Sequence, residues 1–531
     1  ALLKEKGYHA EILNWAHMGK TSEAVARTLR EKRPDVVGFS VLQANRWGAL
    51  EIAETVKAVN PEVTIVFGGI GATFLWKHFL THFKVVDFCV LGEGEYSFLN
   101  LVQALEKGNR KNLKAIKGIA FRTPKGPMKT DDAEPIKNLD DLPIPSKYFT
   151  YQHVTSTRGC PGNCTFCGSP QFWGRKVRFH SPPYFVDQLA LLYDRGIMFF
   201  YFSDDTFMLK KKRVIEICKE IIDRGLKISW FAISRVDLVD EEVLYWMRTA
   251  GCTQISYGVE SGSKKIRAFL NKNIQTEQIK KAFQMTQQYG ILARAYFIYG
   301  SPGESWRTIQ DSIDLIHEIK PMSAIFYILD IFPGTALYDN FLKQSGLTDD
   351  IWLKKIEDIM YFETDPSLSQ ELILAFGKKL RASFYKAVSG FANTIELTDR
   401  KDFRHLNADF LSRLAMTFSH GDYAKIENIP NKGETAKNLY QRSLNYAPND
   451  RAYLGLGMIK QREGVFREAI TLLDEGLGVF PENDQLKLCK GISHMNMGEF
   501  QTALVCFQGI RDSKQADPYK KECYKALETM G

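Results

Sequence analysis

Three cysteines stand close together in the chain, at Cys160, Cys164 and Cys167, with the spacing C-x3-C-x2-C. Cysteine thiolates are the usual ligands of iron–sulfur clusters, so three of them can hold three irons of a [4Fe–4S] cube. No fourth cysteine follows nearby, and one iron therefore keeps an open coordination position. The triplet predicts a cluster that binds a ligand at its open iron and passes an electron to it.

Two other interpretations of the triplet are weaker. A structural zinc site needs a fourth Cys or His ligand, and His180 lies thirteen residues beyond Cys167 across an apolar and basic loop. The second alternative is that the three cysteines are incidental core residues. We favour the cluster.

A strand followed by a helix recurs six times after residue 150. This strand-then-helix pattern is typical of the βα units of a barrel, whose functional residues lie at the carboxyl ends of the strands. We therefore expect a partial (β/α)6 barrel over residues 151–345, following a proline-rich linker over 121–150. The expected strands are Val154–Thr157, Met198–Ser203, Ile228–Ile233, Thr253–Tyr257, Leu292–Tyr299 and Ala324–Leu329.

Polar or glycine-containing loops follow the expected barrel strands. Asp204 and Asp205 follow the second strand, Arg235 the third, Glu260 the fourth and Gly300 the fifth. Taken singly, each has an ordinary explanation such as a helix cap or a surface ion pair. Their common position at the strand ends favours one binding site instead.

The first 120 residues alternate between short apolar strands and helices, which predicts a doubly wound parallel sheet with its ligand site beyond the carboxyl ends of the strands. Glycines in such loops let the backbone approach a ligand closely. The expected strands are Tyr8–Leu13, Val36–Ser40, Thr64–Phe67 and Val85–Leu91, and the expected helices are Ser22–Lys32 and Leu50–Val59. The candidate loop residues are Ser40, Leu42, Gly68, Gly69, Gly92 and Glu93.

The triplet, with Phe166 before its last cysteine, resembles the signature of radical SAM enzymes. The ordered loops S-x-L, GG and G-E-G-E upstream of it resemble the cobalamin-binding domain of B12-dependent radical SAM enzymes. The resemblance implies a [4Fe–4S] cluster, S-adenosylmethionine (SAM) and cobalamin as cofactors. In that family SAM chelates the open iron, and an electron cleaves it to a 5′-deoxyadenosyl radical.

The same resemblance implies roles for the barrel loops and the upstream glycines. Asp204 and Asp205 would meet the SAM amino group, Arg235 its carboxylate or ribose region, Glu260 the ribose hydroxyls or amino group, and Gly300 the adenine. The GG loop would lie beside the nucleotide tail of cobalamin. A D-x-H-x-x-G motif, whose histidine binds cobalt in some of these domains, is absent, which leaves the lower cobalt ligand open.

Composition bounds the remaining possibilities. The net charge of +8 over 531 residues is mild and includes no arginine-rich run, so nucleic acid is an unlikely partner. Nine cysteines without a disulfide pattern indicate a reducing, cytoplasmic setting. No apolar run approaches the roughly twenty residues of a membrane helix. Because the chain begins with Ala1 in an apparent helix, we expect a fragment that lacks its first strand.

The C-terminal third repeats. After a mixed helical connector over 346–405, equivalent residues over 406–531 recur at a spacing of 34: Gly457 and Gly491, Phe466 and Phe500, Ala469 and Ala503. This period resembles tetratricopeptide (TPR) repeats and implies an all-α TPR solenoid. Its groove would bind a protein or peptide, or the repeats would only cap the barrel; the sequence leaves both open.

These features predict a cobalamin-dependent methyltransferase that acts on an unactivated carbon of a small-molecule or peptide substrate, with a reductant such as flavodoxin or ferredoxin. One alternative is a radical cyclase or rearrangement enzyme without methyl transfer. Another is a TPR scaffold with a structural or regulatory cluster. A methylthiotransferase is disfavoured because it needs a second cluster, and only Cys89 precedes the triplet. No catalytic residue beyond the cofactor sites is identified.

Overall fold

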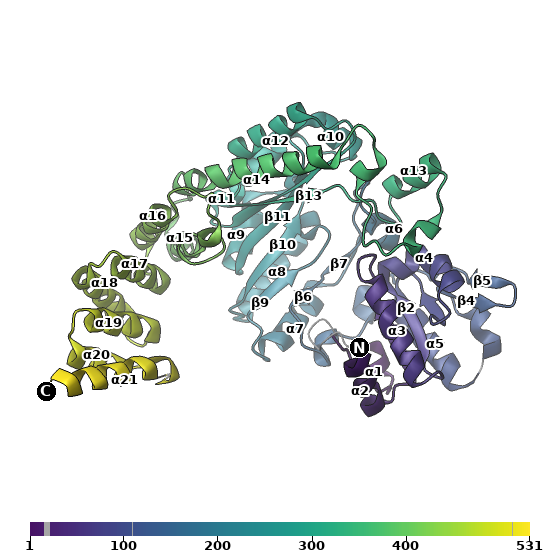
Figure 1. The fold of residues 1–531 in the computed structure, drawn as a ribbon, viewed down its shortest axis with the longest axis horizontal. Coiled ribbons are helices and arrows are strands. Elements are labelled where there is room, and N and C mark those ends of the chain that lie inside the picture. The colour runs from purple at the N-terminus through teal and green to yellow at the C-terminus, as the bar shows by residue number, and fades with distance from the viewer. Residues whose placement is uncertain (15–21, 109, 512, 531) are drawn as a thin grey trace.

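The two larger of the three sheets that the structure describes lie next to each other in the computed structural model, and a row of helices extends away from the six-stranded one (Figure 1). The structure describes residues 1–14, 22–108, 110–511 and 513–530. The fold is mixed α/β in its first two parts and helical in its last part. Among the described residues, no helix combines the length and apolar character needed to span a membrane.

The first sheet has the strand order β1-β2-β3-β4-β5, in which β1 to β3 are parallel and β4 and β5 form an antiparallel hairpin. The strands are β1 (Val36–Ser40), β2 (Thr64–Gly68), β3 (Phe88–Val90), β4 (Ile119–Thr123) and β5 (Gly126–Lys129). The accompanying helices are α2 (Ser22–Lys32), α3 (Arg46–Val59), α4 (Gly69–His82) and α5 (Gly94–Glu106). The three parallel strands and two helices expected here are confirmed, and the boundary expected at residue 120 falls inside β4.

The strand expected at Tyr8–Leu13 is wrong. This segment follows the short helix α1 (Leu2–Glu5) and has no regular secondary structure. The segment lacks the buried apolar face that would hold a strand against the sheet, because Ile12 is 72% exposed and Glu11 pairs with Lys32.

The second sheet contains six parallel strands in the order β13-β12-β11-β10-β9-β6. They are β6 (His153–Val154), β9 (Phe199–Phe202), β10 (Ser229–Ser234), β11 (Cys252–Glu260), β12 (Leu292–Tyr299) and β13 (Ser323–Ile328). The surrounding helices are α7 (Pro182–Tyr193), α8 (Lys211–Asp223), α9 (Glu241–Thr249), α10 (Lys264–Phe269), α11 (Thr276–Gln288), α12 (Trp306–Ile319) and α14 (Gln370–Asn393). Five of the six expected strands are confirmed, whereas the expected Val154–Thr157 is a strand only in part, because β6 ends at Val154 and Thr157 lies in the separate strand β7 (Thr157–Arg158). The parallel arrangement of the six strands places all their carboxyl ends on one side.

One apolar core joins the N-terminal domain to the segment that follows the second sheet. Leu75 of α4 and Ile331, Tyr338 and Trp352 belong to the same buried cluster. Tyr338 lies on α13 (Ala336–Ser345) and Trp352 on the 3-10 helix η6 (Asp349–Leu353). Because this core crosses the boundary between the two sheets, the two domains are packed against each other rather than merely linked.

Arg46, on α3 of the N-terminal domain, packs against this boundary. Its side chain is 1% exposed, and its guanidinium lies 5.0 Å from the ring of Trp352. The guanidinium donates to the carbonyls of Gln43 (2.9 Å), Lys354 (3.3 Å) and Ile356. Burial lowers its pKa to about 10, so the side chain is charged at neutral pH.

The chain ends in paired helices, which confirms the expected helical character; the TPR assignment remains a prediction. Glycines let the helices approach, since a β-carbon at Gly457 would lie 2.9 Å from Leu473 and one at Gly491 would lie 2.4 Å from Phe507. The helices are α15 (Arg404–Ser419), α16 (Lys432–Tyr446), α17 (Asp450–Arg462), α18 (Phe466–Val479), α19 (Asp484–Asn496), α20 (Phe500–Gln508) and α21 (Ser513–Met530).

Replacing Arg46 tests this boundary. We expect Arg46→Ala to lower the free energy of unfolding by about 3 kcal/mol, because it leaves buried carbonyls without donors and opens a cavity beside Trp352. Urea unfolding measures the loss. Arg307→Ala is the control, since that side chain is 89% exposed. An equal, small change in both variants would contradict the assigned role of Arg46.

Candidate functional site

The cysteine loop begins directly after the short strand β7 (Thr157–Arg158), next to the carboxyl ends of the second sheet. A β-carbon at Gly162 would lie 3.3 Å from Cys160 Sγ and 4.0 Å from Cys164 Sγ, so the loop folds both sulfurs back over this glycine. Burial raises the pKa of the Cys167 thiol to about 11, with the charges of Cys164 and Cys160 contributing. The three thiols therefore form one electrostatically coupled group.

This group does not fit a single metal ion. Ligands of one ion must converge on it, and among the described residues the three sulfurs do not all lie within 4.8 Å of one another. His180, the fourth ligand considered for zinc, has its Nδ1 3.1 Å from Asp140 Oδ1 and its ring stacked on Tyr184. The arrangement fits a cube, in which each thiolate binds a different iron.

Two positive charges lie near the sulfurs. Burial raises the pKa of the Cys164 thiol, and the charges of Lys272 and Arg235 act against that rise. Arg235 donates twice to Asp237, with both distances 2.9 Å. Lys272 donates to Glu260 at 2.8 Å, and both side chains are buried. These cations offset the negative charge that three thiolates bring to a cluster site.

Lys272 is not among the site residues that the sequence predicts. It lies just after α10, twelve residues beyond its partner Glu260, and no motif marks it. Glu260 itself has φ +65°, and the pairing between β11 and β12 shifts register next to it. Such a backbone conformation is costly for a residue with a side chain and is typical of functional sites. The strained turn and the lysine together fix the Glu260 carboxylate.

Asp204 and Asp205 were both expected to meet the same ligand group, but they differ in burial and in hydrogen-bond partners. Asp204 is 1% exposed and accepts hydrogen bonds from Ser156 N (2.8 Å), Ser156 Oγ (3.0 Å) and Thr157 Oγ1 (2.7 Å). It thus fixes the turn before the cysteine loop. Asp205 is exposed, accepts from Ser169 Oγ, and contributes to the raised pKa of Cys167. Asp205 is therefore the aspartate available to a ligand beside the sulfurs.

Gly300 and Phe166 are the other two residues expected near the cluster, and they lie in different parts of the second domain. Gly300 has φ +83°, a conformation that glycine adopts without strain, and it begins the turn after β12. Glu304 closes this turn by accepting from Ser301 N (3.1 Å) and Thr308 Oγ1 (3.0 Å). Phe166 packs against the core that joins the two domains, so its ring also serves the domain boundary.

The three candidate loops of the N-terminal domain meet at the carboxyl edge of its parallel strands. Val41 N donates to Gly68 O (2.8 Å), and Gly71 N donates to Val41 O (2.9 Å). Thr73 Oγ1 donates to the carbonyl of Gly69 and accepts from Gly92 N (2.9 Å). These bonds hold the expected loops as one continuous edge.

Glycines and exposed residues line this edge. Gly69 has φ +88°, and a β-carbon there would lie 3.1 Å from Val41 O. A β-carbon at Gly92 would meet no atom within 4 Å, and Ser40 is exposed. Leu42 is 53% exposed, which is a large exposure for a leucine at a sheet edge. An apolar, glycine-lined edge of this kind fits the face of a large ring cofactor.

Glu93 belongs to this edge but also contacts the other domain. It pairs with Arg158 (3.2 Å) and with Arg178, and Glu95 pairs with Arg158 as well. Burial alone would raise the pKa of Glu93, but hydrogen bonds and charges from the arginines more than offset it and lower the pKa. Arg158 is two residues from Cys160, so these pairs connect the two candidate cofactor edges directly.

Comparison with known families assigns both domains. The radical SAM superfamily matches residues 154–316, and the B12 binding domain matches residues 1–102. The chain is 33% identical over 403 residues to an uncharacterized methyltransferase, PH0819, of Pyrococcus horikoshii, a match that covers 72% of this chain and 86% of the relative.

A second relative and one solved structure extend the comparison. The chain is 30% identical over 354 residues to the anaerobic magnesium-protoporphyrin IX monomethyl ester cyclase of Rubrivivax gelatinosus, covering 63% of this chain and 64% of the cyclase. The fold is similar to that of the cobalamin-dependent radical enzyme OxsB with aqua-cobalamin and SAM bound, with TM-score 0.58 and 17% identity over 84% of this chain and 76% of OxsB.

The turn after β12 gives a pH-dependent test. Burial raises the pKa of Glu304 from 4.5 to about 7, so the folded chain retains a proton that the unfolded chain loses. Stability should therefore fall as the pH rises from 4.5 to 7. Glu304→Gln, which stays neutral, should be more stable than the wild type by less than about 1 kcal/mol at pH 5 and by up to about 3 kcal/mol at pH 8.

Urea unfolding at the two pH values measures the difference. Glu277→Gln is the control, because the Glu277 side chain is 83% exposed and should show no such change. A stability difference between Glu304→Gln and the wild type that is the same at pH 5 and pH 8 would contradict the assignment.

Proposed function

Because the chain belongs to the radical SAM superfamily and carries a B12-binding domain, we propose that it transfers a methyl group to an unactivated carbon of a small-molecule or peptide substrate. It is a radical SAM enzyme, and its cofactors are a [4Fe–4S] cluster, SAM and cobalamin. The observation that carries the proposal is the pairing of Glu93 with Arg158 and Arg178, which joins the edge of the B12-binding domain to the cysteine loop.

When bound, the cluster and SAM supply a 5′-deoxyadenosyl radical, and cobalamin supplies the methyl group. Cys160, Cys164 and Cys167 would hold three irons, while Lys272 and Arg235 partly neutralise the thiolates. The protein's contribution is to position these groups and to exclude water, since the cofactors carry the difficult chemistry.

The exposure of the candidate side chains indicates which of them can contact SAM. We propose that exposed Asp205 meets the SAM amino group, while buried Asp204 holds the turn beneath it. Glu260, fixed by Lys272, would accept from ribose hydroxyls, and Arg235 would meet the SAM carboxylate. Gly300 would lie against the adenine, where its turn leaves the backbone accessible.

The methyl-transfer assignment rests on the relative named a methyltransferase, which the chain covers almost completely. The cyclase is covered over only 64% of its length, and its reaction gives a product of different mass. Methyl transfer adds one CH2 unit to the substrate and consumes a second SAM. Product mass together with the ratio of SAM consumed to 5′-deoxyadenosine formed therefore distinguishes the two reactions.

The C-terminal helices fit a partner-binding role. We propose that they are TPR-like, because glycines spaced by 34 residues lie at close helix contacts. Such repeats offer a concave surface to a protein or peptide. The cluster requires an external electron donor, for which a flavodoxin or ferredoxin is the expected class.

Removing one cluster ligand tests the enzyme assignment. We expect Cys164→Ala to lose reductive formation of 5′-deoxyadenosine from SAM, because two thiolates no longer hold an open-site cube. Anaerobic reconstitution with iron and sulfide, followed by chromatography of the nucleoside, measures this. Cys506→Ala, in the distant helices, is the matched control and should retain activity. Full 5′-deoxyadenosine formation by Cys164→Ala would refute the assignment.

Cobalamin binding is tested at the exposed leucine of the N-terminal edge. We expect Leu42→Glu to weaken cobalamin binding at least about 10-fold, because a charge would be buried against the ring. Visible absorbance of cobalamin retained per chain measures it. Leu374→Glu is the control, since Leu374 on α14 is 52% exposed against 53% for Leu42. Equal cobalamin retention in both variants would exclude this edge as the binding face.

A further inference from the structure

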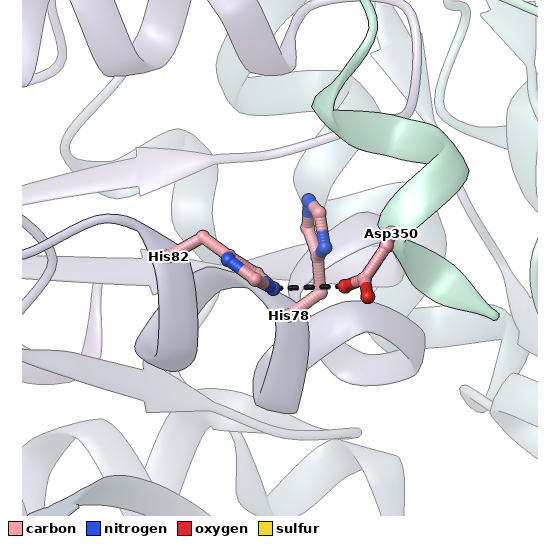
Figure 2. A group of neighbouring side chains, drawn as sticks. All are labelled: His78, His82 and Asp350. Carbon is pink, nitrogen blue, oxygen red and sulfur yellow. Dashed lines mark hydrogen bonds and ion pairs between the residues drawn. The ribbon is translucent and has the colours of Figure 1, made fainter.

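Three potential metal ligands converge away from the cysteine loop (Figure 2). His78 and His82 lie one turn apart on α4, so their rings share one face of the helix. Asp350, on η6, approaches the same point, with its Oδ1 2.9 Å from His82 Nε2. One ligand atom from each residue lies within 4.8 Å of the other two.

His78 is the residue that lacks a structural explanation. Its side chain is 3% exposed, and neither ring nitrogen has a hydrogen-bond partner. A buried polar group without a partner costs about 1–3 kcal/mol, so native structures rarely leave one unsatisfied. The ring lies 5.1 Å from that of His82, between centroids, and Figure 2 shows it beside the His82–Asp350 pair.

We propose that His78, His82 and Asp350 bind a divalent cation of the Zn²⁺ type. Two imidazoles and one carboxylate are a donor set that suits Zn²⁺, and a water molecule would complete a tetrahedral site. His82 and Asp350 keep part of their surface in solvent, with side-chain exposures of 29% and 63%, which gives the ion and its water an entry path. The cation would satisfy one orphaned nitrogen of His78.

The surrounding charges are compatible with this ion. Burial, which is the largest cause, lowers the pKa of His78 to about 4, so its ring is neutral and can coordinate a metal. The charge of Arg46 also acts on His78, but the two Nη atoms of this arginine already donate to backbone carbonyls. Asp350 supplies the negative charge that partly balances the ion.

The position of the site gives it a structural task. His78 and His82 belong to the B12-binding domain, whereas Asp350 follows the second sheet, next to Trp352 of the shared core. A bound cation would therefore fasten the two domains together at a point separate from Glu93 and its arginines. This proposal concerns domain attachment and goes beyond the proposed methyl transfer.

Zinc binding to the full chain tests the proposal. In a background with Cys160, Cys164 and Cys167 replaced by Ala, which removes thiolates that would bind zinc themselves, Zn²⁺ affinity is measured by competition with a chromophoric chelator. We expect one Zn²⁺ per chain. His82→Ala and Asp350→Asn should each weaken binding at least about 10-fold, as loss of even an outer-shell partner does.

Exposed His405→Ala and Asp132→Asn are the matched controls and should bind as the background does. Elemental analysis of the cluster-containing wild type and Asp350→Asn repeats the test with the cysteines present; the wild type should hold one zinc more. Binding of no zinc by the background, or a loss below 10-fold in both ligand variants, would overturn the proposal. Formation of 5′-deoxyadenosine is a separate readout and tests the proposed function independently.

Discussion

The structure depends on how the B12-binding domain is held against the cysteine loop. Glu93 lies on the ligand edge of the first domain, and its carboxylate meets Arg158 and Arg178 of the second. Because Arg158 is two residues from Cys160, a single partly buried ion-pair group sets the distance between two cofactor edges that chemistry requires to face each other. The apolar core around Trp352 and Arg46 adds area to the same boundary.

Ion pairs that are largely shielded from solvent position side chains more than they stabilise the fold. Removing charges from water costs about as much as their attraction returns, so a buried salt bridge is weak evidence for net stability. Removing one partner nevertheless destabilises the fold, because it leaves the other charge unpaired. The pairing therefore specifies one arrangement of the two domains. The same reasoning applies to Lys272 and Glu260: the pair holds one carboxylate beside the sulfurs while placing a positive charge where three thiolates gather.

Features encoded locally could be predicted from the sequence. Five of the six strands of the second sheet, the parallel strands of the first and the cysteine loop all depend on short apolar runs or fixed spacing. Lys272 and the arginine partners of Glu93 could not be predicted, because those contacts join segments distant in the chain. Asp204 could be placed at a strand end but not separated from Asp205, since burial distinguishes them. The strand predicted at Tyr8–Leu13 is absent, because that segment has no buried apolar face to hold it against a sheet.

The central claim is that the chain holds an open-site cluster facing the cobalamin edge. Pulsed electron paramagnetic resonance on the chain loaded with cobalamin tests it most directly, with the cluster reduced and the cobalt in its paramagnetic Co(II) state. The account predicts a dipolar interaction between the two spins that is resolved in the wild type and altered when Glu93 is replaced by Gln. Two signals that relax independently in the doubly loaded wild type would contradict it.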